Sequence, residues 1–458
     1  MEDQKKLYLF EESPISRAVF SMAIPTVISS LIMVIYSLSD TYFVGMLNNA
    51  VENAAVTLAA PILLAFNAVN NLFGVGSSSM MSRALGRREY DMVRRIAAFA
   101  FWCTVAASAL FSALYLIARE PLLALLGTNP ETYLATRQYL DWTVACGAVP
   151  AILNVVLAYM VRSEGSTLHA SIGTMSGCIL NIILDPIFIL PQGLDMGAAG
   201  AGCATFLSNC VACVYFFVLL FARRGKTYVC IDPRRFSFDK GIVLGVCGVG
   251  IPASIQNLLN VTGMTVLNNF TSPFGPNAVA AMGIAHKVNM VPMNISMGFS
   301  QGVMPLVSYN YASGNTRRMR KAVVFSAEIT LSFLVLVAVG YFLGSESIIR
   351  LFIENPDIVA YGSAFLRAMC FGMPFLSLDF LAVGVFQAVG MGKKALLFAI
   401  LRKIVLEIPA IYVLNYFFPL YGLAYSQLVA EVILAAAAIF TLRRILSASG
   451  SPSRAKQN

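Results

Sequence analysis

Charged residues are scarce in this 458-residue chain, where Asp, Glu, Lys and Arg together make up 12% of the sequence. Soluble domains carry about 25% charged and about 45–50% apolar residues, whereas 58% of this chain is hydrophobic. This composition excludes a water-soluble globular protein. The hydrophobic residues form continuous runs of about 20 residues rather than the short alternating segments of a transmembrane barrel. The sequence therefore predicts an all-α integral membrane protein.

The chain also lacks the residue patterns of common catalytic and metal sites. Its only histidines are His169 and His286, and its nine cysteines contain a single CxxC pair, Cys210-Val211-Ala212-Cys213, which lies inside an apolar run. Because most cysteines fall inside apolar runs, we expect reduced packing residues rather than disulfides or metal ligands. The sequence contains no HExxH motif and no ATP-binding P-loop. Gly298-Phe299-Ser300-Gln301-Gly302 matches GxSxG, but it lies inside a predicted span rather than at the strand-to-helix turn that a nucleophile elbow requires. We therefore expect no enzyme, no structural metal site, no bound cofactor and no ATP hydrolysis by this chain.

Twelve apolar runs are long enough to span a bilayer. They are predicted at residues 18–46, 54–80, 96–117, 132–161, 168–190, 198–222, 242–270, 278–306, 322–343, 358–388, 395–417 and 421–444. The loops on one side hold nearly all the basic residues, including the C-terminal Arg454 and Lys456, whereas the loops on the other side hold only Arg119 and Arg350. The positive-inside rule places the basic loops and both termini in the cytoplasm. This distribution explains the net charge of +9 without a nucleic-acid partner.

The sequence repeats itself at an offset of about 225 residues. Pro25 in the first span has its counterpart in Pro252 of the seventh, and Gly165 has its counterpart in Gly390. Six spans per unit is an even number, so the two units share one orientation and are parallel repeats. The predicted domains are an N-lobe of six transmembrane helices at 1–222, a cytoplasmic linker at 223–241 and a C-lobe of six transmembrane helices at 242–458.

Two carboxyl groups inside apolar runs indicate function, because burying a charge in a membrane is costly. Asp185 follows Asn181 by four residues in the fifth span, so both lie on one helix face. Pro186 has no N–H and leaves the carbonyl of Ile182 without a donor. Asp40 lies in the outer half of the first span. Two carboxylates in one low-dielectric pocket cannot both be charged cheaply, so we expect the pair to bind a proton or a small cation. In a two-lobed membrane protein built from repeats, such a pair predicts ion-coupled transport.

Other polar residues within the spans could either line a functional site or only pack, because a membrane Asn or Thr often makes only a packing hydrogen bond. Asn154 and Thr205 would add neutral oxygens to the ion site. The side chains predicted to line a substrate cavity are Tyr36, Asn67, Asn71, Met290, Met293 and Met297. In the C-lobe we predict a polar network of His286, Lys287, Glu407 and Glu431. A buried Lys287 would pair with an acid of the same lobe, either as a structural lock or with a role in substrate binding.

Motifs spread over the whole chain resemble a known family. They include Ser39-Asp40-Thr41-Tyr42-Phe43-Val44-Gly45, Asn181-Ile182-Ile183-Leu184-Asp185-Pro186 and Gly200-Ala201-Gly202-Cys203-Ala204-Thr205. In this order and spacing they resemble the multidrug and toxic compound extrusion (MATE) family, within it the MepA-type and DinF-type bacterial branch. The resemblance implies twelve transmembrane helices in two parallel six-helix repeats that form a V-shaped transporter with alternating access.

The resemblance also implies a function and a site. It implies efflux of amphipathic, often cationic small molecules by antiport with H⁺ or Na⁺ across the bacterial inner (cytoplasmic) membrane, and we expect a monomer in the lipid bilayer. The coupling-ion site of relatives matches Asp40, Asn154, Asn181, Asp185 and Thr205. Another branch of the family uses acids on the seventh and tenth spans; the matching residues here are Asn260 and Asp379, which we add to the predicted cavity. The loss of the seventh-span acid favours coupling in the N-lobe.

One alternative within the wider superfamily is a flippase for lipid-linked precursors. A flippase for anionic headgroups would line its cavity with several Arg or Lys side chains. The sequence offers few intramembrane cations, chiefly Lys287, so it favours drug export. A membrane-embedded enzyme would need a nucleophile and base that the sequence does not show.

Overall fold

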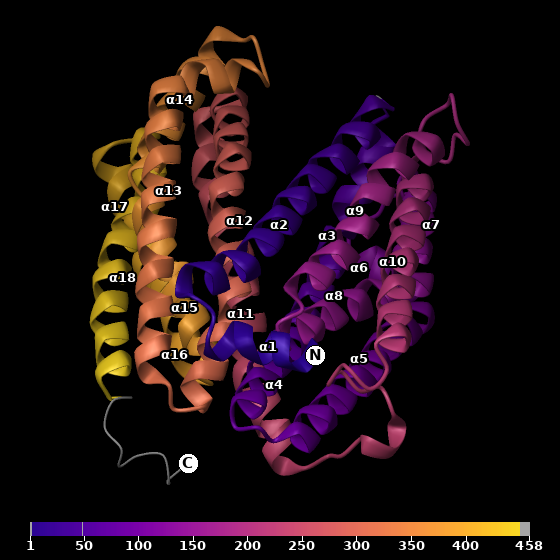
Figure 1. Cartoon of the computed structure of the whole chain (residues 1–458). Helices are drawn as coiled ribbons and strands as arrows, with labels where there is room; N and C mark the ends of the chain where they lie inside the picture. Colours follow the sequence, from indigo (N-terminus) through magenta and orange to yellow (C-terminus); the bar gives the residue numbers. More distant parts are fainter. Residues whose placement is uncertain (1, 48, 449–458) are drawn as a thin grey trace. The chain divides into compact units, whose positions relative to one another are not determined.

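The structure, a computed structural model, describes residues 2–47 and 49–448 (Figure 1). Arg454 and Lys456, which the charge pattern assigned to the cytoplasm, and the end of the predicted C-lobe at 449–458 lie outside the described residues. Within the described ranges the chain forms helices and no strands, as continuous apolar runs predict, since a helix satisfies every backbone hydrogen bond within one segment.

The first half of the chain forms ten α-helices and two π-helices in the described residues. They are α1 (Glu2–Glu11), α2 (Ile15–Met46), α3 (Ala50–Asn70), the π-helix η1 (Asn71–Val75), α4 (Gly76–Gly86), α5 (Tyr90–Ile117), α6 (Arg119–Leu125), α7 (Tyr133–Leu140), the π-helix η2 (Asp141–Cys146), α8 (Ala148–Ser163), α9 (Thr167–Ile189) and α10 (Gly197–Ala222). A 3₁₀ helix, η3 (Pro233–Arg235), lies in the predicted linker.

The second half follows the same plan. Its helices are α11 (Lys240–Thr271), the 3₁₀ helix η4 (Ser272–Phe274), α12 (Pro276–Ala312), α13 (Thr316–Arg350), α14 (Pro356–Cys370), α15 (Met373–Ala388), α16 (Gly392–Ile400), the π-helix η5 (Leu401–Glu407), α17 (Ile408–Phe417) and α18 (Tyr421–Ala448).

All twelve predicted spans fall on helical segments. Eight segments among the described residues are long and apolar enough to cross a membrane, and the number rises to ten if each bent pair is one span. The pairs are α7–η2 with α8, bent by 50°, and α14 with α15, bent by 52°. The other two predicted spans coincide with α12 and with α16–η5–α17. In the second of these, η5 carries Arg402, Lys403 and Glu407 in the middle of the span.

The two halves repeat details of the backbone as well as of the sequence. Gly165 and Gly390 have φ angles of 87° and 82°, and Asp195 and Leu420 have φ angles of 51° and 66°. The members of each pair are 225 residues apart. Each glycine lies two residues beyond the end of a bent span, α8 or α15, where a left-handed residue stops the helix and lets the chain turn. Positions that need an unusual backbone are thus preserved between the repeats.

By packing, the chain divides into two compact units. Unit 1 contains the residues up to Leu9 and Ile28–Ser254, and unit 2 contains Phe10–Val27 and the residues from Ile255 onward. The division falls inside the long helices α2 and α11, in each case two residues after a proline, Pro25 or Pro252. Packing and sequence repetition divide a chain by different criteria, so the boundaries of the N-lobe, linker and C-lobe stay predictions.

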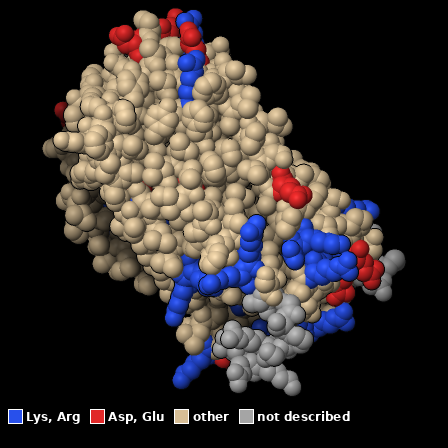
Figure 2. All heavy atoms as spheres, turned by 90° about the vertical axis from the view of Figure 1, so that its left-hand side faces the viewer, with Lys and Arg blue, Asp and Glu red and all other residues tan. Residues whose placement is uncertain are grey.

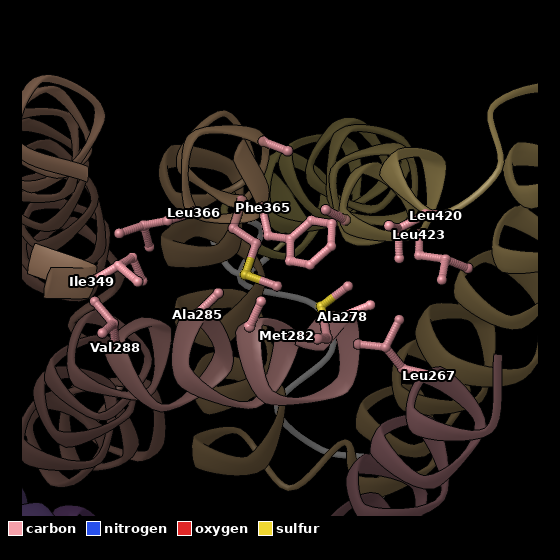
Figure 3. Close-up of a cluster of buried hydrophobic side chains, with 14 of the residues drawn as sticks. Leu267, Ala278, Met282, Ala285, Val288, Ile349, Phe365, Leu366, Leu420 and Leu423 are labelled. Carbon is pink, nitrogen blue, oxygen red and sulfur yellow. The ribbon is translucent and has the colours of Figure 1, made fainter. Parts of the chain in front are cut away.

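A cluster of buried side chains forms part of the core of unit 2 (Figure 3). On α12 the cluster includes Ala278, Met282 and Ala285, spaced as one face of a helix. Small residues on this face let α14 approach closely, and Phe365 and Leu366 of α14 cover it. Part of the core of unit 2 is therefore closely packed and apolar.

Basic side chains gather toward one end of unit 2. Figure 2 shows Lys and Arg concentrated at the lower end of the face in view, with a smaller mixed group of charges at the upper end. The exposed basic residues at the α12–α13 and α15–α16 connections and at the end of α18 are Arg317, Arg320, Lys321, Lys393, Lys394, Arg443 and Arg444. Arg350 lies at the opposite end of α13, where it pairs with Glu346 at 2.6 Å. This is the polarity that the positive-inside rule predicts for unit 2.

Candidate functional site

In unit 1 the helices α9 and α10 lie close together because α9 presents a glycine to α10. A Cβ atom at Gly177 would lie 3.2 Å from the Cβ of Ala212 and 3.2 Å from the carbonyl oxygen of Ser208. A larger side chain would therefore push the helices apart. One turn further along α9, Asn181 faces Thr205 of α10 across this narrow interface.

Asn181 links the Asp185 carboxylate to α10. With its nitrogen turned toward Asp185, the Asn181 amide donates to Asp185 Oδ2 at 2.8 Å, and its oxygen accepts from the Thr205 backbone N–H at 3.1 Å and from the Thr205 hydroxyl at 3.3 Å. Asn181 and Asp185 are 2% and 0% exposed. The spacing of four residues thus places the two side chains on one buried helix face, as predicted, and the helix continues past Pro186 to Ile189.

Asp40 of α2 belongs to the same group. It lies within electrostatic range of Asp185 and of the hydroxyl groups of Tyr36 and Tyr139. The Tyr36 hydroxyl hydrogen-bonds with Thr205. Asp40 Oδ1 is buried without a hydrogen-bond partner in the described part of the chain. We call the group of Tyr36, Asp40, Asn181, Asp185 and Thr205 the Asp185 cluster.

Asn154 of α8 forms hydrogen bonds within its own helix and to α10. Its amide nitrogen donates to the Pro150 carbonyl at 2.7 Å, to the Ala151 carbonyl at 3.1 Å and to Asn209 Oδ1 at 2.9 Å. Asn154 is therefore buried beside the Asp185 cluster's helices and tied to Asn209 of α10, one turn beyond Thr205. In this arrangement its contribution to the ion site would be through its amide oxygen alone.

The residues of the Asp185 cluster fit a proton or a sodium ion. The cluster offers carboxylate, amide and hydroxyl oxygens, which are hard ligands, and Asp40 Oδ1 has unused hydrogen-bonding capacity. Within the described residues no group of three or more His, Cys, Asp or Glu side chains is arranged to hold a metal ion. The donor set therefore suits a monovalent ion bound by two acids and neutral oxygens rather than a tightly held transition metal.

A second buried polar group lies in unit 2. Arg402 of η5 approaches Glu431 of α18 through Nη2 at 2.5 Å and Asp379 of α15 through Nη1 at 3.6 Å. Its guanidinium carbon also lies 5.1 Å from the ring centroid of Phe380. All three ionic residues are at most 3% exposed. We call Asp379, Arg402 and Glu431 the Arg402 cluster. On the same π-helix Lys403 donates to Glu407 at 2.7 and 2.8 Å.

The structure corrects three expectations about unit 2. Lys287 is exposed and forms no ion pair within the described residues, so the predicted buried partnership with an acid is wrong. Asp379 is only 1% exposed and faces Arg402, so it does not line an open cavity here. Arg402 and Lys403 are further intramembrane cations, so Lys287 is not the chief one. Both are paired with acids, which explains how an apolar bundle accommodates them.

The rest of the predicted polar network and cavity is dispersed. His286 is half-buried and lies within electrostatic range of Lys403 and Glu407. It therefore belongs to the polar network, whereas Lys287 does not. In unit 1, Asn67 is exposed and Asn71 is half-buried. In unit 2, Asn260 and Met293 are half-buried, and Met290 and Met297 are each 36% exposed. Their exposure does not test whether these residues bind substrate, so their place in a substrate cavity stays a prediction.

Four residues in or beside the two polar groups were missed in the sequence: Tyr139, Asn209, Arg402 and Lys403. A signal existed for three of them. Asn209 follows Thr205 by four residues, which is the spacing that identified Asn181 and Asp185. Arg402 and Lys403 interrupt the run 395–417 in the same way that Asp185 interrupts its own. Tyr139 gave no such signal, because a tyrosine is common near a membrane interface.

Comparisons with known proteins agree with this arrangement. A family model described as MatE matches the chain twice, over residues 25–187 and 252–413. The two matches confirm the repeat. The multidrug export protein MepA of Staphylococcus haemolyticus (strain JCSC1435) is 33% identical over 442 residues, which is 96% of each chain. MepA of Staphylococcus aureus (strain MRSA252) is 32% identical with the same coverage.

A solved structure shows the same fold. It is the outward-facing conformation of a multidrug resistance MATE family transporter of the MOP superfamily, which matches with a TM-score of 0.92 and 25% sequence identity and covers 97% of this chain and 98% of that chain. This match confirms the predicted all-α membrane fold with two repeated lobes.

Proposed function

The chain belongs to the MatE family, and we propose that it exports amphipathic, cationic small molecules by antiport with H⁺ or Na⁺. Multidrug export is the function of the MepA relatives, which align with 96% of this chain. The observation that carries the coupling proposal is the Asp185 cluster of unit 1, where the buried Asp185 and the half-buried Asp40 lie within electrostatic range of each other.

The cluster supplies the physical basis of coupling. With both carboxyls ionised, two like charges lie close together in a medium of low dielectric, which is unfavourable. A proton or a sodium ion entering from outside would neutralise part of this charge. The change in charge at Asp185 would alter the hydrogen bonds between α9 and α10, because the Asn181 amide bonds both the Asp185 carboxylate and Thr205. Loading and unloading of the ion would thus shift the balance between conformations of the transporter.

The proposal includes the orientation in the membrane. Both termini and the basic loops would face the cytoplasm of a bacterial cell, with the chain acting as a monomer in the inner membrane. The exposed basic residues at one end of unit 2 support this orientation. The pairing of Arg402 and Lys403 with acids supports export of cations over flipping of anionic headgroups, because neither cation is free to bind an anion.

The test is dye transport in proteoliposomes, with a pH gradient and a sodium gradient imposed in separate experiments. We expect gradient-driven transport of a cationic dye such as ethidium to fall at least about tenfold in Asp40→Asn and in Asp185→Asn. Asp195→Asn is the matched control, since Asp195 is an exposed acid of the same unit and Asn tolerates its positive φ. Undiminished transport in both Asp40→Asn and Asp185→Asn would contradict the coupling proposal.

A further inference from the structure

The Arg402 cluster is built from three helical elements around one buried cation. Asp379 comes from α15, Glu431 from α18 and Arg402 from the π-helix η5, and each is at most 3% exposed. A π-helix widens the helical turn and is frequent at functional sites. Here it directs the adjacent residues Arg402 and Lys403 to different acids of unit 2.

The charges facing the cluster do not balance. Lys403 is paired with Glu407 and lies within electrostatic range of Asp379 and Glu431, but among the described residues only Arg402 forms ion pairs with these two acids, so three acids face two cations. Other neighbouring elements add no fixed cation among the described residues. His286 of α12 lies near the Lys403–Glu407 pair. On α11, a Cβ atom at Gly263 would lie 2.9 Å from Lys403 Cδ, so the glycine admits the lysine but contributes no charge.

Two acids that face one another across a buried space normally need a cation between them. A guanidinium can fill that role permanently, because it remains protonated in proteins and cannot leave. Arg402 contacts one oxygen of each acid, and the Phe380 ring lies against its guanidinium. Asp379 Oδ1 and Arg402 Nε have no hydrogen-bond partner in the part of the chain that the structure describes. One proton on either acid would make the three residues neutral together.

We propose that Arg402 is a tethered counter-cation, which occupies the space between Asp379 and Glu431 and so excludes free sodium from the acids of unit 2. Arg402 is then a specificity-determining residue: it confines binding of the coupling ion to the Asp185 cluster. The inference deepens the proposed function, on which it rests for the role of the Asp185 cluster. It predicts that removing the arginine creates a sodium site where the native protein has none.

The experiment measures sodium-22 binding to purified protein in detergent by scintillation proximity. The background is Asp40→Asn with Asp185→Asn, so that binding at the Asp185 cluster is removed. We expect this background to retain no saturable sodium. Adding Arg402→Gln should raise sodium retention at least about tenfold, because two carboxylates lose their cation in a buried site. Adding Arg402→Lys should not, since lysine keeps the charge.

Further variants identify the ligands and guard against loss of folding. Glu431→Gln added to the Arg402→Gln background should abolish the new binding, because it removes one of the two acids. If Arg402→Gln unfolds, the arginine-intact background still decides the question. Sodium retained there and lost on Asp379→Asn or Glu431→Gln would show that the acids bind sodium despite Arg402, and would overturn the proposal.

A well-folded Arg402→Gln variant that retains no sodium would also overturn it, and would leave Arg402 with a structural role only. This outcome differs from failure of the proposed function. That failure is seen as undiminished dye transport in Asp40→Asn and Asp185→Asn with Arg402 intact, and the sodium-binding assay does not depend on dye transport.

Discussion

At the scale of single residues, the hydrogen bonds of the Asn181 amide connect the members of the Asp185 cluster. Asn181 bonds the Asp185 carboxylate on its own helix and the backbone and hydroxyl of Thr205 on the next. The position of Asn181 and Asp185 on one face followed from helical periodicity, which depends only on sequence spacing. The contacts of Asn154 with Asn209 could not be predicted in this way, because the partner of a side chain on another helix depends on how the helices rotate and cross.

Replacing Asn181 should weaken the Asp185 cluster more than replacing Thr205. In Asn181→Leu the buried carboxylate loses its amide donor, which costs about 1–3 kcal/mol, so we expect gradient-driven dye transport to fall about tenfold or more. In Thr205→Val the backbone N–H at 205 still donates to Asn181, and the loss should be smaller, about threefold. Initial rates of transport in proteoliposomes measure both. Equal losses in the two variants would contradict the role given to the Asn181 amide.

At the scale of helices, small residues and local departures from α-helical geometry place the polar groups. Gly177 brings α9 against α10, and the π-helix η5 directs Arg402 and Lys403 to separate acids. The bends of 50° and 52° in α7–α8 and α14–α15 recur at matching places in the two repeats. Prolines and glycines in the sequence indicated the repeats. The π-helices were not foreseen, because a wider turn has no distinct apolar periodicity over five to seven residues.

A large side chain at Gly177 should separate α9 from α10. Gly177→Leu would overfill the contact with Ala212 and Ser208, at a cost of about 1–3 kcal/mol. We expect a lower midpoint of thermal unfolding in detergent, followed by intrinsic fluorescence, and a loss of dye transport as Asn181 moves away from Thr205. Gly248→Leu in α11 is the matched control, because a Cβ atom at Gly248 meets nothing within 4 Å. The same loss in both variants would show that the effect is not specific to the α9–α10 contact.

At the scale of the whole chain, two copies of one helical plan carry different polar groups. Unit 1 has two acids with neutral partners, and unit 2 has acids paired with Arg402 and Lys403. The shared plan appears in the paired positive-φ residues and in the two matches to the MatE family. This difference between the units agrees with our proposal that unit 1 binds a mobile ion while unit 2 holds its own cation.

The orientation of the chain in the membrane can be tested with single cysteines in a variant that lacks the native ones. Leu194→Cys, in the loop between α9 and α10, should react with a membrane-impermeant maleimide in intact cells. Lys394→Cys, at the start of α16, should react only after the membrane is permeabilised. Both positions are exposed, so a failure to label reflects the side of the membrane. The opposite pattern would reverse the topology inferred from the basic loops.

The sequence by itself determined the class of the protein, its helical spans and its repeat, and it located the acids that we propose for ion coupling. These features are encoded locally: apolar run length gives a span, loop charge gives an orientation, and a spacing of four residues gives a shared helix face. Tertiary structure alone decided which acids are paired. Asp379 and Glu431 lie 52 residues apart in the chain and meet at Arg402. Lys287, which the sequence predicted to pair with an acid of the same lobe, is exposed. Contacts between helices depend on packing, and no local pattern in the chain specifies them.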